Sequence, residues 1–349
     1  MNVRERTAWL RAGVRGWGGV GAMATLCALA VVCALLLPLT QATGVSGTGR
    51  AGSGLARGVQ ARADTCEDPQ DQSLSPSGGD GEKTPTLDAI KGRKDRRLIV
   101  GVDQNSYRWG YLDPNSESGQ LEGFDIDLVH RIAKDLLGDP DAVQFRAIPT
   151  SRRIDAVKDG EVDMVVRTMT ISCARLADVA FSAPYFRTGQ QVLAPKNSTI
   201  TGYDTSLAGK RICSADGSTA HDELVADHKN GRLPASADIA TTVPSQLECL
   251  VRLQLGQVDA VVTDGALAAS QAAQDPTVEL KGGLFTDEYY GVAMKRGADD
   301  LVRQVNRTLA AYIKDPDGWR TSYATWLHPT LDQGDEKSTS ATPPTAHYK

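Results

Sequence analysis

The sequence of 349 residues lacks the short motifs that mark several large classes of enzyme. It contains no Gly-x-Ser-x-Gly turn for a nucleophilic serine, no His-Glu-x-x-His pair for a zinc peptidase and no glycine-rich loop that would cradle a phosphate. No pair of a nucleophile and an activating base is evident either. We therefore expect a protein that is not an enzyme.

Metal-ligand spacings and basic runs are absent as well. No Cys-x-x-Cys pair occurs and the five histidines are scattered, so the sequence predicts neither a metal site nor a cofactor. Lysine and arginine together number 38 against 43 aspartates and glutamates, and no basic run offers contacts for a phosphate backbone. We therefore expect no nucleic-acid partner.

One long apolar run is present near the N-terminus. Residues 18–39 contain no charged side chain, and four arginines precede them: Arg4, Arg6, Arg11 and Arg15. About 20 apolar residues can span a membrane as a helix, and the arginines place its N-terminal side in the cytoplasm. Residues 1–43 are expected to be a signal peptide, cleaved after the small-residue pattern at 40–42, or a retained membrane anchor, which we favour. Both place the remaining chain outside the cytoplasm, anchored to the cell membrane or secreted.

Polar segments flank the central part of the chain. Residues 44–95 are rich in Gly, Ser, Asp and Pro and poor in large apolar side chains, which predicts a flexible stalk. Leu87 and Ile90 are spaced for one short helical turn within it. The polar tail at 333–349 is expected to be disordered.

Between these flanks the pattern alternates strand and helix. Apolar runs at 98–102, 143–148 and 162–166 predict buried strands. Apolar residues at helical spacing follow Asp125 and predict a helix with Asp125 as its N-cap and Gly138 as its end. The order βαβαβ predicts an α/β protein with parallel strands.

A short internal repeat suggests two similar lobes. Gly-Glu-Val-Asp-Met-Val-Val at 160–166 recurs as Gly-Gln-Val-Asp-Ala-Val-Val at 256–262, and the flanking helices correspond. Ligands of open α/β sheets lie beyond the carboxyl ends of the strands. The side chains at those ends include both acidic and basic groups, which suits a zwitterionic ligand. They are Asp103, Arg167, Thr168, Thr263 and Asp264.

Through the order and spacing of several short sequence motifs, the chain resembles the amino-acid-binding solute receptors of ABC importers. The motifs are Gly-Phe-Asp-Ile-Asp-Leu at 123–128, the repeat at 160–166, Thr170 with Arg175, Phe-Ser-Ala-Pro-Tyr at 181–185, Leu-Ala-Gly-Lys at 207–210, and Val-Asp-Ala at 258–260 with Asp264. The resemblance covers residues 96–331 and implies the type II periplasmic-binding-protein fold, in which two α/β lobes are joined by a two-segment hinge. The lobes would be 96–194 plus 290–332, and 195–289.

A narrower resemblance points to the actinobacterial glutamate-binding group. It is carried by Arg-Thr-Met-Thr-Ile-Ser-Cys at 167–173, by Cys213 and Cys249, and by the Pro-Pro tail at 343–344 that leads to Tyr348. This resemblance implies glutamate or aspartate as the ligand. It also implies an ABC permease as partner, although a membrane signalling protein that reports amino acids is an open alternative. A lyase or dehydratase on the same fold is the disfavoured third possibility.

The resemblance also implies roles for individual side chains. The planar fork of Arg175 suits a carboxylate, and with Thr168, Thr170 and Thr219 it would hold the ligand α-carboxylate. Asp264 would face the α-ammonium. Two further arginines would meet the side-chain carboxylate: Arg153, assisted by Arg167.

Two other features of the site stay open at this point. Asp103 stands where well-known glutamate receptors have a basic residue, so glutamine, asparagine and basic amino acids remain in consideration. Tyr107 or Trp109 could stack on the ligand or could equally pack in the lobe.

Four cysteines lie outside the apolar run, in what we expect to be an oxidising compartment. Of three possible connectivities we expect Cys213–Cys249 and Cys66–Cys173. Closure is expected around hinge segments 192–195 and 290–293, when a ligand bridges Arg175 and Asp264.

Overall fold

A computed structural model of the chain describes residues 66–78, 83–115, 119–331 and 341–349, all of which belong to one compact unit, 63–349. The expected signal peptide or anchor at 1–43 and the first part of the expected stalk lie outside the described residues. Within the described ranges, no helix is both long enough and apolar enough to cross a membrane.

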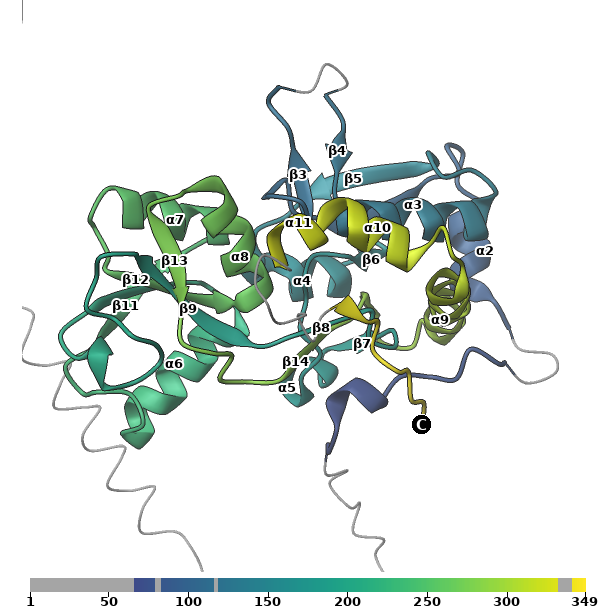
Figure 1. Cartoon of the computed structure of the whole chain (residues 1–349). Coiled ribbons are helices and arrows are strands. Elements are labelled where there is room, and N and C mark those ends of the chain that lie inside the picture. The colour runs from purple at the N-terminus through teal and green to yellow at the C-terminus, as the bar shows by residue number, and fades with distance from the viewer. Residues whose placement is uncertain (1–65, 79–82, 116–118, 332–340) are drawn as a thin grey trace, which may run out of the picture. The chain divides into compact units, whose positions relative to one another are not determined.

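The first lobe is built on a five-stranded sheet with the order β5-β1-β6-β15-β7 (Figure 1). Its strands are β1 (Leu98–Val102), β5 (Val143–Ala147), β6 (Met164–Val165), β7 (Val179–Phe181) and β15 (Ala293–Lys295). β1 pairs in parallel with β5 and β6, whereas β15 is antiparallel to β6 and β7. The chain therefore returns from the second lobe to complete the first sheet.

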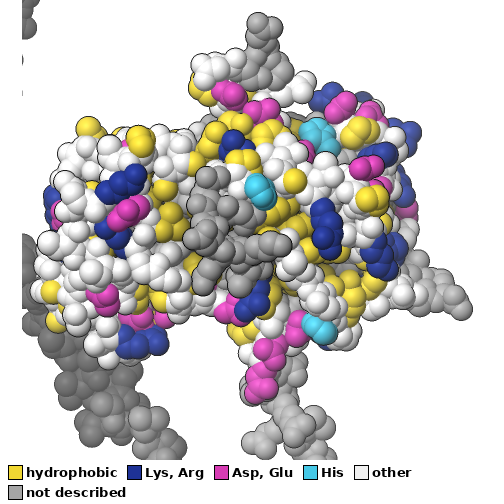
Figure 2. Space-filling model, viewed as in Figure 1, with side chains coloured by type: hydrophobic (Ala, Val, Ile, Leu, Met, Phe, Trp, Pro, Cys, Tyr) yellow, Lys and Arg dark blue, Asp and Glu magenta, His cyan; other side chains and the backbone are white. Residues whose placement is uncertain are grey.

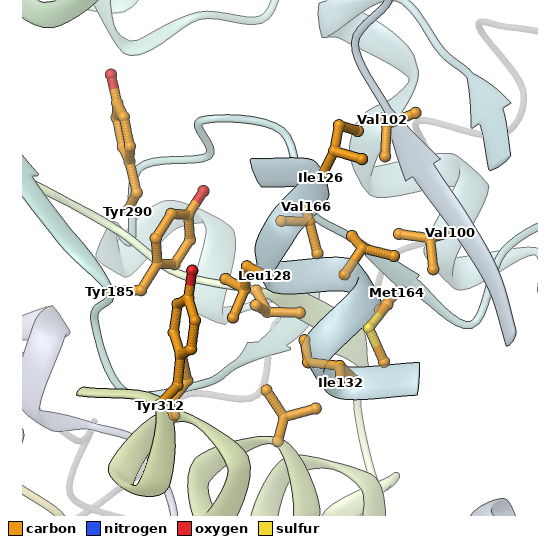
Figure 3. Packing of buried hydrophobic residues seen from close by; sticks show 14 of the residues in the cluster. Val100, Val102, Ile126, Leu128, Ile132, Met164, Val166, Tyr185, Tyr290 and Tyr312 are labelled. Atoms are coloured by element: carbon orange, nitrogen blue, oxygen red, sulfur yellow. The ribbon is translucent and has the colours of Figure 1, made fainter. Parts of the chain in front are cut away.

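Helices cover this sheet and enclose its core. They are α3 (Phe124–Leu137), α4 (Arg153–Lys158), α5 (Cys173–Leu176), α9 (Asp299–Lys314), α10 (Trp319–Trp326) and α11 (His328–Leu331), with the 3₁₀ turn η2 (Thr150–Arg152). Figure 3 shows α3 laying its apolar face against the sheet, through Ile126, Leu128 and Ile132. The strands β2 (Asn105–Ser106), β3 (Gly110–Leu112) and β4 (Leu121–Glu122) form a small separate sheet beside this lobe.

The start of α3 differs from the sequence prediction. Gly123 is the N-cap, with φ of 129°, and a Cβ there would lie 2.4 Å from the backbone oxygen of Trp109. Only glycine fits this close approach. Asp125, which we expected to be the N-cap, is instead the second helical residue, and its carboxylate is buried inside the lobe.

The second lobe has a sheet of the same size with the order β11-β10-β12-β9-β13. Its elements are β9 (Gln190–Pro195), η3 (Thr205–Leu207), β10 (Arg211–Ala215), α6 (Thr219–Asn230), β11 (Asp238–Val243), α7 (Gln246–Gln254), β12 (Ala260–Asp264), α8 (Gly265–Gln274) and β13 (Val278–Lys281). Gly160 and Gly256 occupy equivalent turns, with φ of 72° and 66°, before β6 and β12. The internal repeat therefore encodes the same helix-glycine-strand turn in both lobes, and the expected α/β fold with two sheet-containing lobes is confirmed.

Two antiparallel strands join the lobes: β8 (Phe186–Thr188) and β14 (Glu288–Tyr290) (Figure 1). The expected first hinge segment, 192–195, lies instead inside β9, between β12 and β13 of the second sheet. Its buried apolar residues pack in that sheet, so the first crossing falls upstream, at 186–190. The second crossing falls at β14, beside the expected segment 290–293.

Part of the segment that we expected to be a flexible stalk packs on the first lobe. Helix α2 (Pro85–Lys91) buries Leu87 and Ile90, as their spacing suggested, and two of its backbone N–H groups donate to Asp300. The stretch before it contains η1 (Pro69–Asp71), and buried Ser73 donates to the Phe181 carbonyl. The C-terminal residue also contacts this stretch, because the Lys349 N–H donates to the backbone oxygen of Ser73.

Each lobe carries one disulfide. Cys66 is bonded to Cys173 and thereby ties residue 66 to α5, whereas Cys213 is bonded to Cys249 and ties β10 to α7. On the face drawn in Figure 2, acidic and basic side chains are interspersed, as the nearly balanced composition suggests.

Candidate functional site

A polar cavity lies between the lobes, where the carboxyl ends of β6 and β12 face the start of α6. Its lining comes from both lobes: Thr150, Arg153, Arg167, Thr168, Thr170, Arg175, Ser218, Thr219, Gln246, Asp264 and Leu267. The structure thus brings together all but two of the expected ligand-binding residues. Asp103 and Tyr107 do not line this cavity.

Two buried arginines form its cationic side. Arg153 is 4% exposed and donates from Nε to Thr150 O at 3.0 Å and from Nη1 to Arg167 O at 3.2 Å. Arg175 is 6% exposed and donates from Nη1 to Thr170 O at 2.7 Å. No carboxylate of the described residues lies within ion-pair distance of either guanidinium.

The two guanidinium groups also share one acceptor on the opposite lobe. The carbonyl of Gly217 accepts from Nη2 of Arg153 at 3.2 Å and from Nη2 of Arg175 at 3.1 Å. Gly217 has φ of 71°, and a Cβ there would lie 2.8 Å from Ser151 Cα. Glycine therefore permits the close approach of the lobes at this point. Burial lowers the pKa of both arginines, and for Arg153 the neighbouring cations lower it further.

Two buried carboxylates lie on the anionic side: Asp264 lines the cavity, and Glu288 lies behind the lining. The amide Nε2 of Gln190 donates to Asp264 Oδ1 at 2.6 Å and to Glu288 Oε1 at 2.7 Å, so one side chain bridges both. Glu288 Oε2 accepts from Thr170 Oγ1 at 2.6 Å and Thr219 Oγ1 at 3.0 Å. Burial and the charge of Glu288 raise the pKa of Asp264 to about 7.

Asp103 and Arg167, which we expected at the ligand, form a buried ion pair with each other. Arg167 Nη2 lies 2.7 Å from Asp103 Oδ2, and Arg167 Nη1 donates to Thr150 Oγ1. Asp103 also accepts from the backbone N–H groups of Gln104 and Asn105, at 2.8 and 2.9 Å. The carboxylate thus anchors the loop after β1 and neutralises Arg167, and it does not line the cavity.

Thr168 adopts a backbone conformation that is uncommon for a β-branched residue, with φ of 40°. Its N–H, which we expected to face the ligand α-carboxylate, donates to Asp125 Oδ2 at 3.0 Å. Asp125 also accepts from the Tyr185 hydroxyl at 2.8 Å, and burial raises the pKa of Asp125 to about 7. Thr168 therefore lines the cavity, but its N–H is already bonded to Asp125.

Neither aromatic residue considered for stacking lines the cavity. Trp109 is fully buried against Phe124 and Phe186, and its indole N–H donates to Ser270 Oγ of the second lobe at 3.2 Å. Tyr107 packs edge-on against Tyr111, with ring centroids 5.1 Å apart. Both side chains therefore have packing roles.

Sequence reasoning missed three residues that bond to the cavity lining: Gln190, Gly217 and Glu288. Gln190 and Glu288 lie where the chain crosses between lobes, and no repeat or motif marks those strands. The single signal for Glu288 was an acidic residue flanked by aromatic ones, Phe285 and Tyr290. Gly217 could have been found as the glycine that follows β10 directly before the start of α6.

Known proteins resemble this chain over the same region. Residues 98–329 match the family model described as bacterial extracellular solute-binding proteins, family 3. The ABC transporter glutamine-binding protein GlnH of Bacillus subtilis is 32% identical over 252 residues, which cover 72% of this chain and 89% of that protein. The glutamate-binding protein GluB of Corynebacterium glutamicum is 28% identical, covering 68% and 79%.

Solved structures agree with this assignment. The solute receptor for L-cysteine of Neisseria gonorrhoeae superposes with a TM-score of 0.65 at 28% identity, over 74% of this chain and 99% of that one. An ancestral arginine-binding protein bound to glutamine gives a TM-score of 0.59 at 32% identity, over 66% and 97%. These relatives are binding proteins, which confirms the expectation that the chain is not an enzyme. The chain belongs to family 3 of the bacterial extracellular solute-binding proteins.

Proposed function

We propose that this protein binds a dicarboxylic amino acid, glutamate or aspartate, between its lobes outside the cytoplasm and delivers it to an ABC permease. The observation that carries the proposal is the charge arrangement of the cavity. Arg153 and Arg175 are buried without a carboxylate partner among the described residues, and Asp264 lines the other side of the same cavity. Glu288 lies behind that side, where it accepts a hydrogen bond from Thr170 of the lining.

Buried charges are costly unless a counter-charge accompanies them. Two guanidinium groups without a protein partner call for two carboxylates, and a dicarboxylic amino acid supplies both. Arg175 would hold the α-carboxylate and Arg153 the side-chain carboxylate, while the α-ammonium would face Asp264. Each contact is a charge-assisted hydrogen bond in a site shielded from water.

Closure of the lobes is the proposed binding step. The Gly217 carbonyl reaches across from the second lobe to both arginines, and the Thr219 hydroxyl reaches Glu288. A ligand carboxylate is a stronger acceptor for a guanidinium than a neutral carbonyl. The ligand would therefore replace the Gly217 contact and favour the closed form through its own bonds to both lobes.

The relatives support binding of an amino acid and leave its side chain to be decided. The names of two relatives specify glutamine, in Bacillus subtilis and Geobacillus stearothermophilus, and that of another specifies glutamate. The charge arrangement favours the acid over the amide here, because an amide would leave Arg153 without a counter-charge. An ABC permease is the partner expected for receptors of this family.

A panel of amino acids tests the proposal. Isothermal titration of the purified protein should show tightest binding for glutamate or aspartate, weaker binding for glutamine and asparagine, and none for lysine. Binding of lysine or of sugars alone would contradict the proposal.

A pair of variants tests the role of Arg153. Arg153→Met keeps the aliphatic stem but removes the charge, so glutamate affinity should fall by more than tenfold and glutamine affinity by much less. Arg152→Met is the matched control, because Arg152 is half exposed and pairs with Glu161 on the surface. Equal losses for both ligands in Arg153→Met would show that this arginine does not read the side chain.

A further inference from the structure

The disulfide Cys66–Cys173 lies beside the ligand cavity. Cys173 is the first residue of α5, and Arg175, which lines the cavity, belongs to the same helix. α5 is a single turn of 4 residues, whose N-cap Ser172 accepts from the Arg175 N–H at 3.3 Å. Isolated helices shorter than about 12 residues are barely stable in water. The position of Arg175 therefore depends on what holds this turn from outside.

The stretch 66–73, which starts at the disulfide, is itself fixed to the first lobe. The hydroxyl of Ser73 donates to the carbonyl of Phe181, in β7, at 2.9 Å. It accepts from the amide Nδ2 of Asn306, in α9, at 2.8 Å, and both of these side chains are buried. Cys66 therefore belongs to a segment that packs against a strand and a helix of the lobe.

Two short stretches are thus joined at both of their ends. The stretches 66–73 and 173–181 meet at the disulfide at one end and at the hydrogen bond from Ser73 to Phe181 at the other. α5 lies inside the ring that these links close. The guanidinium of Arg175 therefore enters the cavity from a turn that a covalent cross-link holds in place.

We propose, building on the function proposed above, that Cys66 and Cys173 are positioning residues for ligand binding. Their disulfide holds α5 so that Arg175 is already oriented toward the α-carboxylate, and reduction of the disulfide weakens the binding of every amino-acid ligand. A cross-link that orders a loop in advance removes the free energy of ordering from the binding step. Without the bond, closure on a ligand has to order α5 and the Arg175 side chain, so affinity should be about tenfold lower.

The loss should be the same for all ligands that carry an α-carboxylate. Arg175 would hold that group, which glutamate and glutamine share. Arg153, which would read the side chain, lies on α4 and donates to the carbonyls of Thr150 and Arg167, outside the cross-linked stretches. The ratio of the glutamate and glutamine affinities should therefore not change when the disulfide is opened.

The two disulfides differ in their access to solvent. Cys66 is exposed and Cys173 is partly exposed, whereas Cys213 and Cys249 are completely buried. Exchange requires that a thiolate reach a sulfur atom of the disulfide, so a dithiol at low concentration should reduce Cys66–Cys173 and leave Cys213–Cys249 intact. Two electrons and two protons pass from the dithiol to Cys66 and Cys173, which become thiols, and the dithiol closes to a cyclic disulfide.

Isothermal titration before and after reduction tests the inference. The folded wild type is treated with dithiothreitol until mass mapping shows thiols at Cys66 and Cys173 only, and is then titrated with glutamate and with glutamine. Both affinities should fall about tenfold with an unchanged ratio, and reoxidation should restore them. Unchanged affinities in the reduced protein would overturn the inference and leave the proposed function intact.

A pair of variants separates positioning from overall stability. Cys66→Ser opens the same bond without changing any residue that lines the cavity, and it should show the affinity of the reduced wild type. Cys213→Ser is the matched control, because it opens the disulfide of the second lobe and should lower the free energy of unfolding while both affinities stay unchanged. Equal losses of affinity in the two variants would refute the positioning role.

The two proposals fail in different ways. Absence of binding heat with every amino acid of the panel would overturn the proposed function and this inference with it. Binding by the wild type that does not respond to reduction would overturn only the inference. The measurement on the reduced wild type decides between these outcomes even where Cys66→Ser does not fold.

Discussion

Breaking the buried pair of Asp103 and Arg167 should strongly destabilise the first lobe. The side chains are only 8% and 3% exposed, and their closest charged atoms are 2.7 Å apart. Asp103→Asn keeps the shape of the side chain but leaves the guanidinium buried without a counter-charge. Removal of one partner of such a pair costs about 3–5 kcal/mol.

Equilibrium unfolding in urea measures this loss. The tryptophans in the described residues, Trp109, Trp319 and Trp326, all lie in the first lobe, so their fluorescence follows the lobe that contains the pair. The ligand-free variant should unfold at a much lower urea concentration, with the slope of the transition unchanged.

A surface pair of the same lobe supplies the control. Lys158 Nζ lies 2.6 Å from Asp178 Oδ1, a similar distance, but both side chains are almost half exposed. Asp178→Asn should leave the free energy of unfolding unchanged within error, because solvent screens the pair. If Asp103→Asn costs less than about 1 kcal/mol, the assignment of Asp103 as a buried counter-ion is wrong and a role facing the ligand becomes the better explanation.

Three further predictions concern other parts of the molecule. Arg175→Lys replaces a planar fork that reaches two acceptors with a point charge, so amino-acid affinity in isothermal titration should fall by about a hundredfold; unchanged affinity would exclude Arg175 from the site. Cys213→Ser opens the link to Cys249 across 36 residues, and unfolding in urea should show a loss of about 4 kcal/mol; no loss would mean that the bond does not form. Asp125→Asn removes a carboxyl group whose pKa burial raises to about 7. Between about pH 4 and 7 the folded wild type binds more protons than the unfolded chain. As the pH rises through that range, the free energy of unfolding of the wild type should therefore fall by about 1.4 kcal/mol per pH unit relative to that of the variant. Parallel plots of this free energy against pH would contradict the burial of the Asp125 carboxyl group.

The fold and much of the cavity could be predicted from the sequence because local patterns encode them. Buried strands such as 98–102 are continuous apolar runs, and Gly160 and Gly256 mark the same turn in each lobe. The side chains at the carboxyl ends of β6 and β12 followed from the general position of ligands in α/β sheets. Arg167 and Asp264 were located in this way.

Contacts between distant segments could not be predicted in the same way. Arg167 was assigned to the ligand, but its partner is Asp103, 64 positions earlier, and no pattern of spacing joins the two. Glu288 and Gln190 meet only because β8 and β14 pair at the crossing between the lobes. Asp125 has the residue type of an N-cap, yet Gly123 takes that position because the chain passes too close to Trp109 for a side chain.

The two disulfides are distributed so that each lies within a single lobe. Cys66–Cys173 lies wholly on the first lobe and Cys213–Cys249 wholly on the second, so neither crosses the two-stranded connection. Covalent cross-links thus stiffen each half, while the connection between the halves carries no covalent cross-link among the described residues. The proposed closure would therefore need no disulfide to break, because the cross-links and the connecting strands lie in different parts of the chain.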